Sequence, residues 1–101
     1  MDIAYSKNNV PIRLTDERWV HIIENHDDLA GQYDTVLMTI EDPDYILQGY
    51  KNALMALKEI SPNKFFIVVY KELHHDDGFI ITAYISSKIE LTKESIVWHK
   101  K

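Results

Sequence analysis

Residues 65–86 read FFIVVYKELHHDDGFIITAYIS and carry the strongest strand signals of the chain. A first block, Phe65–Glu72, is rich in the β-branched and aromatic residues that favour strands, and a second such block, Phe79–Ser86, follows it. Between them lies a polar turn, His74–Gly78, with the Asp-Gly pair that favours tight connections between antiparallel strands. We therefore expect a β-hairpin at the centre of a sheet.

The two faces of this hairpin differ in character. Side chains alternate between the faces of a strand, so we expect one row of the second block to face the core: Phe79, Ile81, Ala83 and Ile85. The other row contains Thr82 and Tyr84, and it is too polar for a core and too aromatic for an ordinary solvent face. The first block places Phe66, Val68 and Tyr70 on one face. If the rows coincide, Tyr70, Thr82 and Tyr84 line a shallow concave surface.

Two helices are expected before the hairpin. Thr15 is a good N-cap for a helix over Asp16–Asn25. Helical spacing gives that helix an inner face made up of Trp19, Ile22, Ile23 and His26. A second helix is predicted over Leu29–Ile40, and the Pro43 that follows requires it to end.

Shorter extended segments complete the expected α+β domain. Val10–Leu14 reads as an extended lead-in, and Tyr45–Tyr50 as a short strand. Ala53–Ile60 would also suit a helix, but turn signals on both sides favour a strand. The tail, Leu91–Lys101, is expected to add a short helix or an edge strand.

Composition excludes several classes of protein. The chain has 101 residues, of which 46% are hydrophobic and 27% charged, as in one ordinary globular domain. It has no cysteine, which rules out disulfides and thiolate metal sites. Its apolar runs are too short for a membrane span, and no signal peptide is visible, so we expect a cytoplasmic protein without a membrane partner.

Charge is unevenly distributed along the chain. The net charge of −5 argues against a general coat for nucleic acid, since such binding depends on neutralising phosphates. Residues 1–47 carry ten acidic and three basic side chains, whereas residues 48–101 carry eight lysines and six acids. This uneven distribution has two interpretations. One is that the helices simply have an ordinary acidic surface, and the other is that the sheet has a locally basic face that could bind a phosphate.

The candidate chemistry begins with two histidines. Imidazole exchanges a proton near neutrality, which suits general acid–base catalysis. On an uninterrupted helix, His21 and His26 would lie about 140° apart, so they can share a pocket only if the helix ends before His26. His21 shares a face with Arg18 and Asn25. A solvated polar face for His21 and a packed helix-end histidine for His26 remain the alternatives.

Other residues could bind a substrate. Arg18 could hold a phosphate with two hydrogen bonds or could pair with a nearby acid such as Glu24. Thr82 could donate to a phosphoryl oxygen, while Tyr70 or Tyr84 could stack on a base, although all three also favour strands. The polar turn containing His74 and His75 lacks a third distant ligand, so we expect no metal there. With only three glycines and no phosphate-binding glycine loop, we expect no nucleotide cofactor.

These segments together resemble a known group of proteins. The strings at Ile12–Ile22 and His26–Leu29, the Asp42-Pro43-Asp44 stop and the hairpin blocks resemble phage- and mobile-element-associated domains of the barnase–EndoU–colicin–RelE-like (BECR) nuclease superfamily. The resemblance implies N-terminal helices packed on an antiparallel sheet of about four strands. It also implies metal-independent RNA cleavage, often by a toxin or effector. The group has His-Pro-Glu at the second histidine, where this chain has His26-Asp27-Asp28.

The resemblance also implies roles for particular residues. The helix histidine pair corresponds to His21 and His26, and the late-strand hydroxyl to Thr82. The basic residue of an early strand corresponds to Lys51 or Lys58, where an arginine is common in the group.

Two hypotheses follow. The first is a small ribonuclease-like domain. Its expected partners are RNA and a cognate inhibitor or antitoxin. The second is a catalytically silent protein-binding module or homodimer that uses its acidic helical half or an exposed edge strand.

Overall fold

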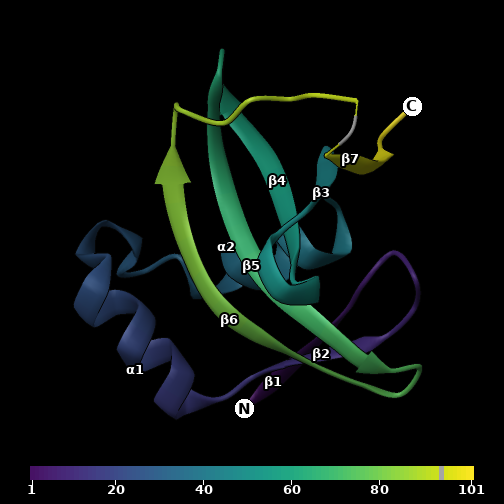
Figure 1. Ribbon diagram of the computed structural model, residues 1–101. Coiled ribbons are helices and arrows are strands. Elements are labelled where there is room, and N and C mark those ends of the chain that lie inside the picture. Colours follow the sequence, from purple (N-terminus) through teal and green to yellow (C-terminus); the bar gives the residue numbers. More distant parts are fainter. Residues whose placement is uncertain (94) are drawn as a thin grey trace.

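A seven-stranded sheet dominates the computed structural model, which describes residues 1–93 and 95–101 (Figure 1). The strands are β1 (Asp2–Tyr5), β2 (Pro11–Leu14), β3 (Tyr45–Gln48), β4 (Leu54–Ser61), β5 (Lys64–His74), β6 (Asp77–Ser86) and β7 (Ile96–His99). The helices are α1 (Asp16–Asn25) and α2 (Tyr33–Glu41), with single 3₁₀ turns η1 (Asp27–Leu29) and η2 (Tyr50–Asn52). The α+β class is thus confirmed.

The sheet is larger than the expected one of about four antiparallel strands. Its order is β1-β2-β6-β5-β4-β3-β7, and β2 pairs with β6 in parallel, through Ile12 with Gly78 and Arg13 with Phe79. β1 was not anticipated because only Ala4 of its four residues is buried, which leaves no apolar alternation to detect. The tail supplies β7, the edge-strand alternative of the two expected for it.

The central hairpin forms as expected, with a tighter turn. β5 and β6 pair antiparallel, and because His74 pairs with Asp77 only two residues form the turn. Gly78 therefore lies inside β6 and not in the turn. β4 is a strand, as its flanking turn signals indicated, and Ala56 and Leu57 are buried on its opposite faces between β3 and β5.

An irregularity in this hairpin reverses one sequence expectation. Val69 pairs with Thr82, but the next residue, Tyr70, pairs with Ile80, so Ile81 is the extra residue of a β-bulge. The bulge puts Ile80 on the same face as Ala83 and Ile85, in the main core. The expected core row of Phe79, Ile81, Ala83 and Ile85 is therefore wrong at its first two positions.

The first helix matches its expected bounds and the second does not. The Thr15 hydroxyl accepts a hydrogen bond from the Arg18 amide at 3.1 Å and so caps α1. α2 begins at Tyr33, whereas Leu29 was expected, because Gly31 adopts a left-handed conformation with φ of +86°. Leu29 is still buried, but it lies in η1.

Two apolar clusters lie on opposite faces of the sheet. The larger one lies between the sheet and the helices and contains Ile22 of α1 and Val36 and Ile40 of α2. The smaller one occupies the other face, centred on Leu57 and Ile67, and receives residues from the segment that crosses from β6 to β7 (Figure 1). We call this second side the helix-free face. No helix within the described residues has the length and apolar character needed to cross a membrane.

Candidate functional site

The candidate site lies where α1 runs alongside β6 (Figure 1). The parallel pairing of β2 with β6 stops at Phe79. Within residues 1–93 and 95–101, no strand pairs with the outer edge of β6 beyond that point. α1 follows β2 directly in the chain and lies next to the part of β6 that β2 does not pair with. Side chains of α1 are thereby held next to the late part of β6.

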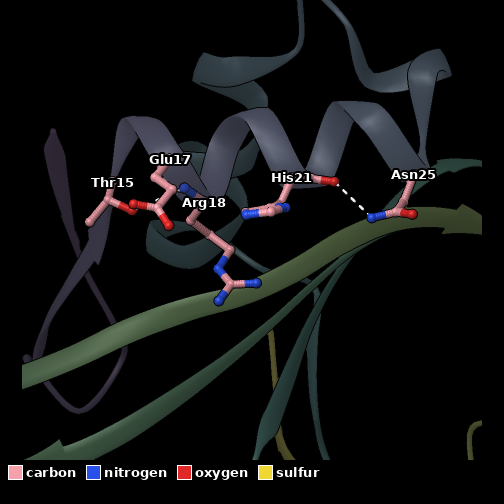
Figure 2. Close-up of a pocket in the computed structure, with 5 residues that line it drawn as sticks. All are labelled: Thr15, Glu17, Arg18, His21 and Asn25. Atoms are coloured by element: carbon pink, nitrogen blue, oxygen red, sulfur yellow. Dashed lines mark hydrogen bonds between the residues drawn. The ribbon is translucent and has the colours of Figure 1, made fainter.

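A hollow of about 380 Å³ lies on one face of α1. Its lining residues are Thr15, Glu17, Arg18, His21 and Asn25. Figure 2 shows the side chain of Arg18 extending from α1 toward the strand with the colour of β6, while the His21 ring lies close to the helix on the same side. The Asn25 amide donates to the His21 carbonyl at 2.9 Å. The shared face of Arg18, His21 and Asn25, expected from helical spacing, is confirmed.

His26 leaves the path of the helix at its C-terminus. Its φ of −139° is not helical, while its backbone N–H still donates to the Ile22 carbonyl at 2.8 Å. The half-buried imidazole lies against Tyr84 of β6, with ring centroids 5.9 Å apart and planes inclined by 32°. The helix therefore ends before His26, which is the condition that the sequence set for the two histidines to share a pocket. His21 lines the α1 hollow, but His26 is not among its lining residues.

Tyr84 and Thr82 lie together on the helix-free face of β6. Tyr84 pairs with Ile67 and Thr82 with Val69, and both side chains are half-buried. Two residues of a strand span roughly 7 Å, so the two hydroxyl-bearing side chains are neighbours along the strand. Burial raises the pKa of Tyr84, which keeps its hydroxyl protonated and able to donate a hydrogen bond at neutral pH.

The expected row of Tyr70, Thr82 and Tyr84 does not form. Thr82 pairs with Val69, so alternation along β5 puts the next residue, Tyr70, on the opposite face of the sheet. Tyr70 lies in the main core on the helix side, with 1% of its surface exposed. Burial and, to a lesser extent, the charge of Glu72 raise the pKa of Tyr70. The sheet separates Tyr70 from the face that carries Thr82 and Tyr84, so these three residues cannot hold one base between them.

The two candidate lysines lie away from the α1 hollow. Lys58 of β4 is held at the end of α2, where its ammonium donates to the Asp42 carbonyl at 3.0 Å and to the Asp42 carboxylate at 3.2 Å. Lys100 and Lys58 together lower the pKa of Asp42. Lys51 lies in η2 in a left-handed conformation, and its ammonium is 5.6 Å from the centroid of the Tyr50 ring.

Basic residues that the sequence reasoning did not single out occur on the helix-free face. Arg13 of β2 forms an ion pair with Asp77, and its guanidinium lies 5.7 Å from the centroid of the Phe79 ring. Lys71 of β5 pairs with Phe79, so its side chain belongs to the same face. Period-two alternation from Ile67 through Val69 to Lys71 would have identified the lysine. Arg13 required the β2–β6 pairing, which no local pattern indicates.

Metal ligands do not gather in the described part of the chain. No group of three histidine, aspartate or glutamate side chains among residues 1–93 and 95–101 could hold a metal ion. At the β5–β6 turn, His74 and His75 are exposed, and Asp77 pairs with Arg13. The polar side chains of the α1–β6 region include the imidazoles of His21 and His26, the Arg18 guanidinium, the Glu17 carboxylate and the hydroxyls of Thr82 and Tyr84.

Comparison with known proteins gives no assignment. No family model, no curated protein and no solved structure matches the chain.

Proposed function

We propose that the chain is a small metal-independent ribonuclease-like domain that binds and cleaves RNA along the edge between α1 and β6. The observation that carries the proposal is the contact of the His26 ring with Tyr84, at 5.9 Å between centroids. That contact places a group able to transfer protons beside the β6 face that carries Thr82. The exposed Arg18 extends toward the same strand, and the exposed His21 lies on the same side of α1 (Figure 2). The resemblance noted from the sequence supports the same function.

The proposed reaction needs only groups found in this region. One imidazole takes the proton of a ribose 2′-hydroxyl, whose oxygen attacks the adjacent phosphorus. The bond from phosphorus to the 5′ oxygen breaks, and the second imidazole gives that oxygen a proton. The products are a 2′,3′-cyclic phosphate and a 5′-hydroxyl. General acid–base groups of this kind contribute about 10²–10⁴-fold to a rate.

Binding of the substrate is proposed to use two sets of groups. Arg18 and the Thr82 hydroxyl donate to the phosphate, on which negative charge develops during the reaction. Lys71 offers positive charge farther along the helix-free face, next to Phe79, whereas the charge of Arg13 is balanced by Asp77. Phe79 and Tyr84 offer aromatic surface, and stacking on a base is worth about 1–3 kcal/mol in proteins that bind single strands. Tyr70, Lys51 and Lys58 have no part in this proposal because they lie elsewhere.

Single-residue variants test the proposal. We expect the wild-type chain to cleave a single-stranded RNA in the presence of EDTA, and we expect His21→Ala or His26→Ala to lower the rate at least about a hundredfold. His26→Phe keeps a ring against Tyr84 but has no exchangeable proton, so it separates catalysis from packing. His75→Ala is the matched control, because His75 is exposed in the turn at the far end of β6.

Three outcomes would contradict the proposal. The first is an absence of cleavage by the wild-type chain over a broad range of RNA sequences and pH. The second is full activity in His26→Phe. The third is an equal loss of activity and melting temperature in His26→Ala with activity restored in His26→Phe, since that pattern assigns His26 a packing role only.

A second candidate, a protein-binding module, is favoured by one observation. β1 is an edge strand, and it exposes Ile3 and Tyr5 with 49% and 53% of their surfaces accessible. An edge strand with exposed apolar side chains can pair with a second copy or another protein. A stable dimer on a sizing column, lost in Ile3→Lys, together with no RNA affinity at low salt would favour this function. A toxin or effector role with a cognate inhibitor remains a proposal attached to the first function.

A further inference from the structure

A second cavity lies on the helix side of the sheet, at the end remote from α1. It has a volume of about 350 Å³ and shares no lining residue with the α1 hollow. Its walls include Lys7, Ile46, Leu54, Tyr70, Glu72 and Trp98. Lys7 belongs to the loop between β1 and β2, and Trp98 to β7, which are at opposite ends of the strand order. The sheet therefore curls until its two ends meet around this cavity.

The cavity contains a carboxylate without a cationic partner among the described residues. Glu72 is half-buried and accepts hydrogen bonds from the Ser6 hydroxyl at 2.5 Å and from the Asn8 amide at 3.0 Å. Both donors are neutral, and no ion pair in residues 1–93 and 95–101 involves Glu72. The charge of Glu72 reaches the neighbouring Tyr70 hydroxyl, whose pKa is raised by burial and by this carboxylate. A half-buried carboxylate with only neutral donors retains attraction for a cation.

An aromatic face in the same cavity already accommodates an ammonium group. The Lys7 ammonium lies over the Trp98 ring, 5.3 Å from its centroid, within the range of a cation–π interaction. Lys7 is exposed and is carried on a long flexible stem, so it can leave this position and remain in water. Glu72, in contrast, is held by hydrogen bonds from Ser6 and Asn8.

We propose that this cavity binds an alkylammonium ligand, a protonated primary amine with a short alkyl chain, and that Lys7 occupies the ammonium position until the ligand displaces it. The ligand's charge lies between Glu72 and the face of Trp98, and its alkyl chain lies against Ile46 and Leu54. An anionic ligand would meet the fixed carboxylate, and among the described residues that line the cavity its one positive group would be the displaceable Lys7. The proposal is independent of RNA cleavage, because the two sites share no residue.

Three probes of equal chain length test the charge preference of the cavity. They are n-pentylamine, which is protonated at neutral pH, n-pentanol and pentanoate. Trp98 fluorescence in a Trp19→Phe background reports binding, since Trp19 and Trp98 are the two tryptophans of the chain. Trp19 packs edge-on against Tyr33 at 5.2 Å, so that background could be destabilised. The NMR resonance of the Trp98 indole N–H in the unchanged chain gives a second readout.

We expect a saturable change with pentylamine only. Glu72→Gln keeps a polar side chain of the same size but removes the charge, and it should weaken pentylamine binding by about tenfold or more. Lys7→Met removes the internal competitor and should tighten binding. Equal binding of pentanol would overturn the proposal in favour of a plain apolar cavity. Binding of pentanoate that is lost in Lys7→Met would overturn it in favour of an anion site, and no saturable change with pentylamine would overturn it outright.

Discussion

Gly78 gives the sharpest test of the packing between β2 and β6. It lies within β6, opposite Ile12 of β2, and it is buried. A Cβ atom added at Gly78 would lie 2.5 Å from Cδ1 of Ile12 and 2.7 Å from the Lys71 carbonyl oxygen. Both distances are far below ordinary van der Waals contact. Ile12 has no exposed surface, and the carbonyl belongs to the backbone of β5, so neither atom can move aside easily.

The sign of the change in the free energy of unfolding of Gly78→Ala shows whether this close contact is present. Without the contact, Gly78→Ala should stabilise the protein by about 0.5–1 kcal/mol, because glycine in a strand interior loses more backbone entropy on folding. Forcing an extra carbon into a packed core instead lowers the free energy of unfolding by about 1–3 kcal/mol. We expect the second effect to dominate. For a domain of this size, 1 kcal/mol corresponds to a fall in melting temperature of roughly 4–8 °C.

Chemical and thermal unfolding, followed by circular dichroism, measure the effect. Gly31→Ala serves as the comparison, since no atom lies within 4 Å of an added Cβ there and only its left-handed backbone conformation opposes the change. That variant should lose about 1–2 kcal/mol through backbone strain alone. A Gly78→Ala protein with unchanged or increased stability would show that β2 does not pack on β6 as described.

Two further predictions concern α1 and the first strand. Thr15→Ala should lower the free energy of unfolding, measured in urea, by about 0.5–2 kcal/mol because the N-cap hydrogen bond is lost. Thr15→Ser keeps a hydroxyl and should retain most of the wild-type stability. Equal losses in the two variants would contradict the capping role of Thr15. The Tyr33 hydroxyl donates to Asp2 at 2.7 Å, and burial, with this hydrogen bond, raises the pKa of Tyr33 from 10.0 to about 12. The unfolded chain therefore loses this proton before the folded one, so the stability advantage of wild type over Tyr33→Phe should shrink as the pH rises from about 10 to 12; an advantage that stays constant or grows would refute this coupling.

The sequence predicted those helices and strands whose caps, turns and apolar spacing all lie within the element itself or directly beside it. α1 has its predicted bounds because its cap and the apolar spacing of Trp19 and Ile22 agree. The β5–β6 hairpin follows from two strongly apolar blocks. The start of α2 was missed because the apolar stripe continues through Leu29, while the left-handed Gly31 divides the segment. A stripe of apolar residues cannot by itself report a break in the backbone.

Features that depend on distant segments could not be predicted in this way. The parallel pairing of β2 with β6 joins Ile12 to Gly78 across the chain, and it determines that α1 lies beside β6. Phe66, Val68 and Tyr70 share a face as expected, but the register that pairs Val69 with Thr82 puts Thr82 and Tyr84 on the other face, and no local pattern indicates that register. The bulge at Ile81 leaves no mark on the alternation of an almost wholly apolar strand, so Phe79 and Ile81 were wrongly expected in the core row. Prediction of the shared face of Arg18 and His21 needed only helical spacing. The contact of His26 with Tyr84 needed the whole fold.

The chemical ends of the RNA fragments report whether an imidazole catalyses the cleavage. A single-stranded RNA is incubated with the wild-type chain in EDTA, and its products are analysed by mass spectrometry. The proposed chemistry predicts 2′,3′-cyclic phosphate and 5′-hydroxyl ends, and it predicts that they form at least about a hundredfold more slowly in His26→Phe and at the wild-type rate in His75→Ala. Intact RNA with the wild-type chain, or the same cyclic-phosphate ends at an undiminished rate in His26→Phe, would contradict the role of the imidazole that contacts Tyr84.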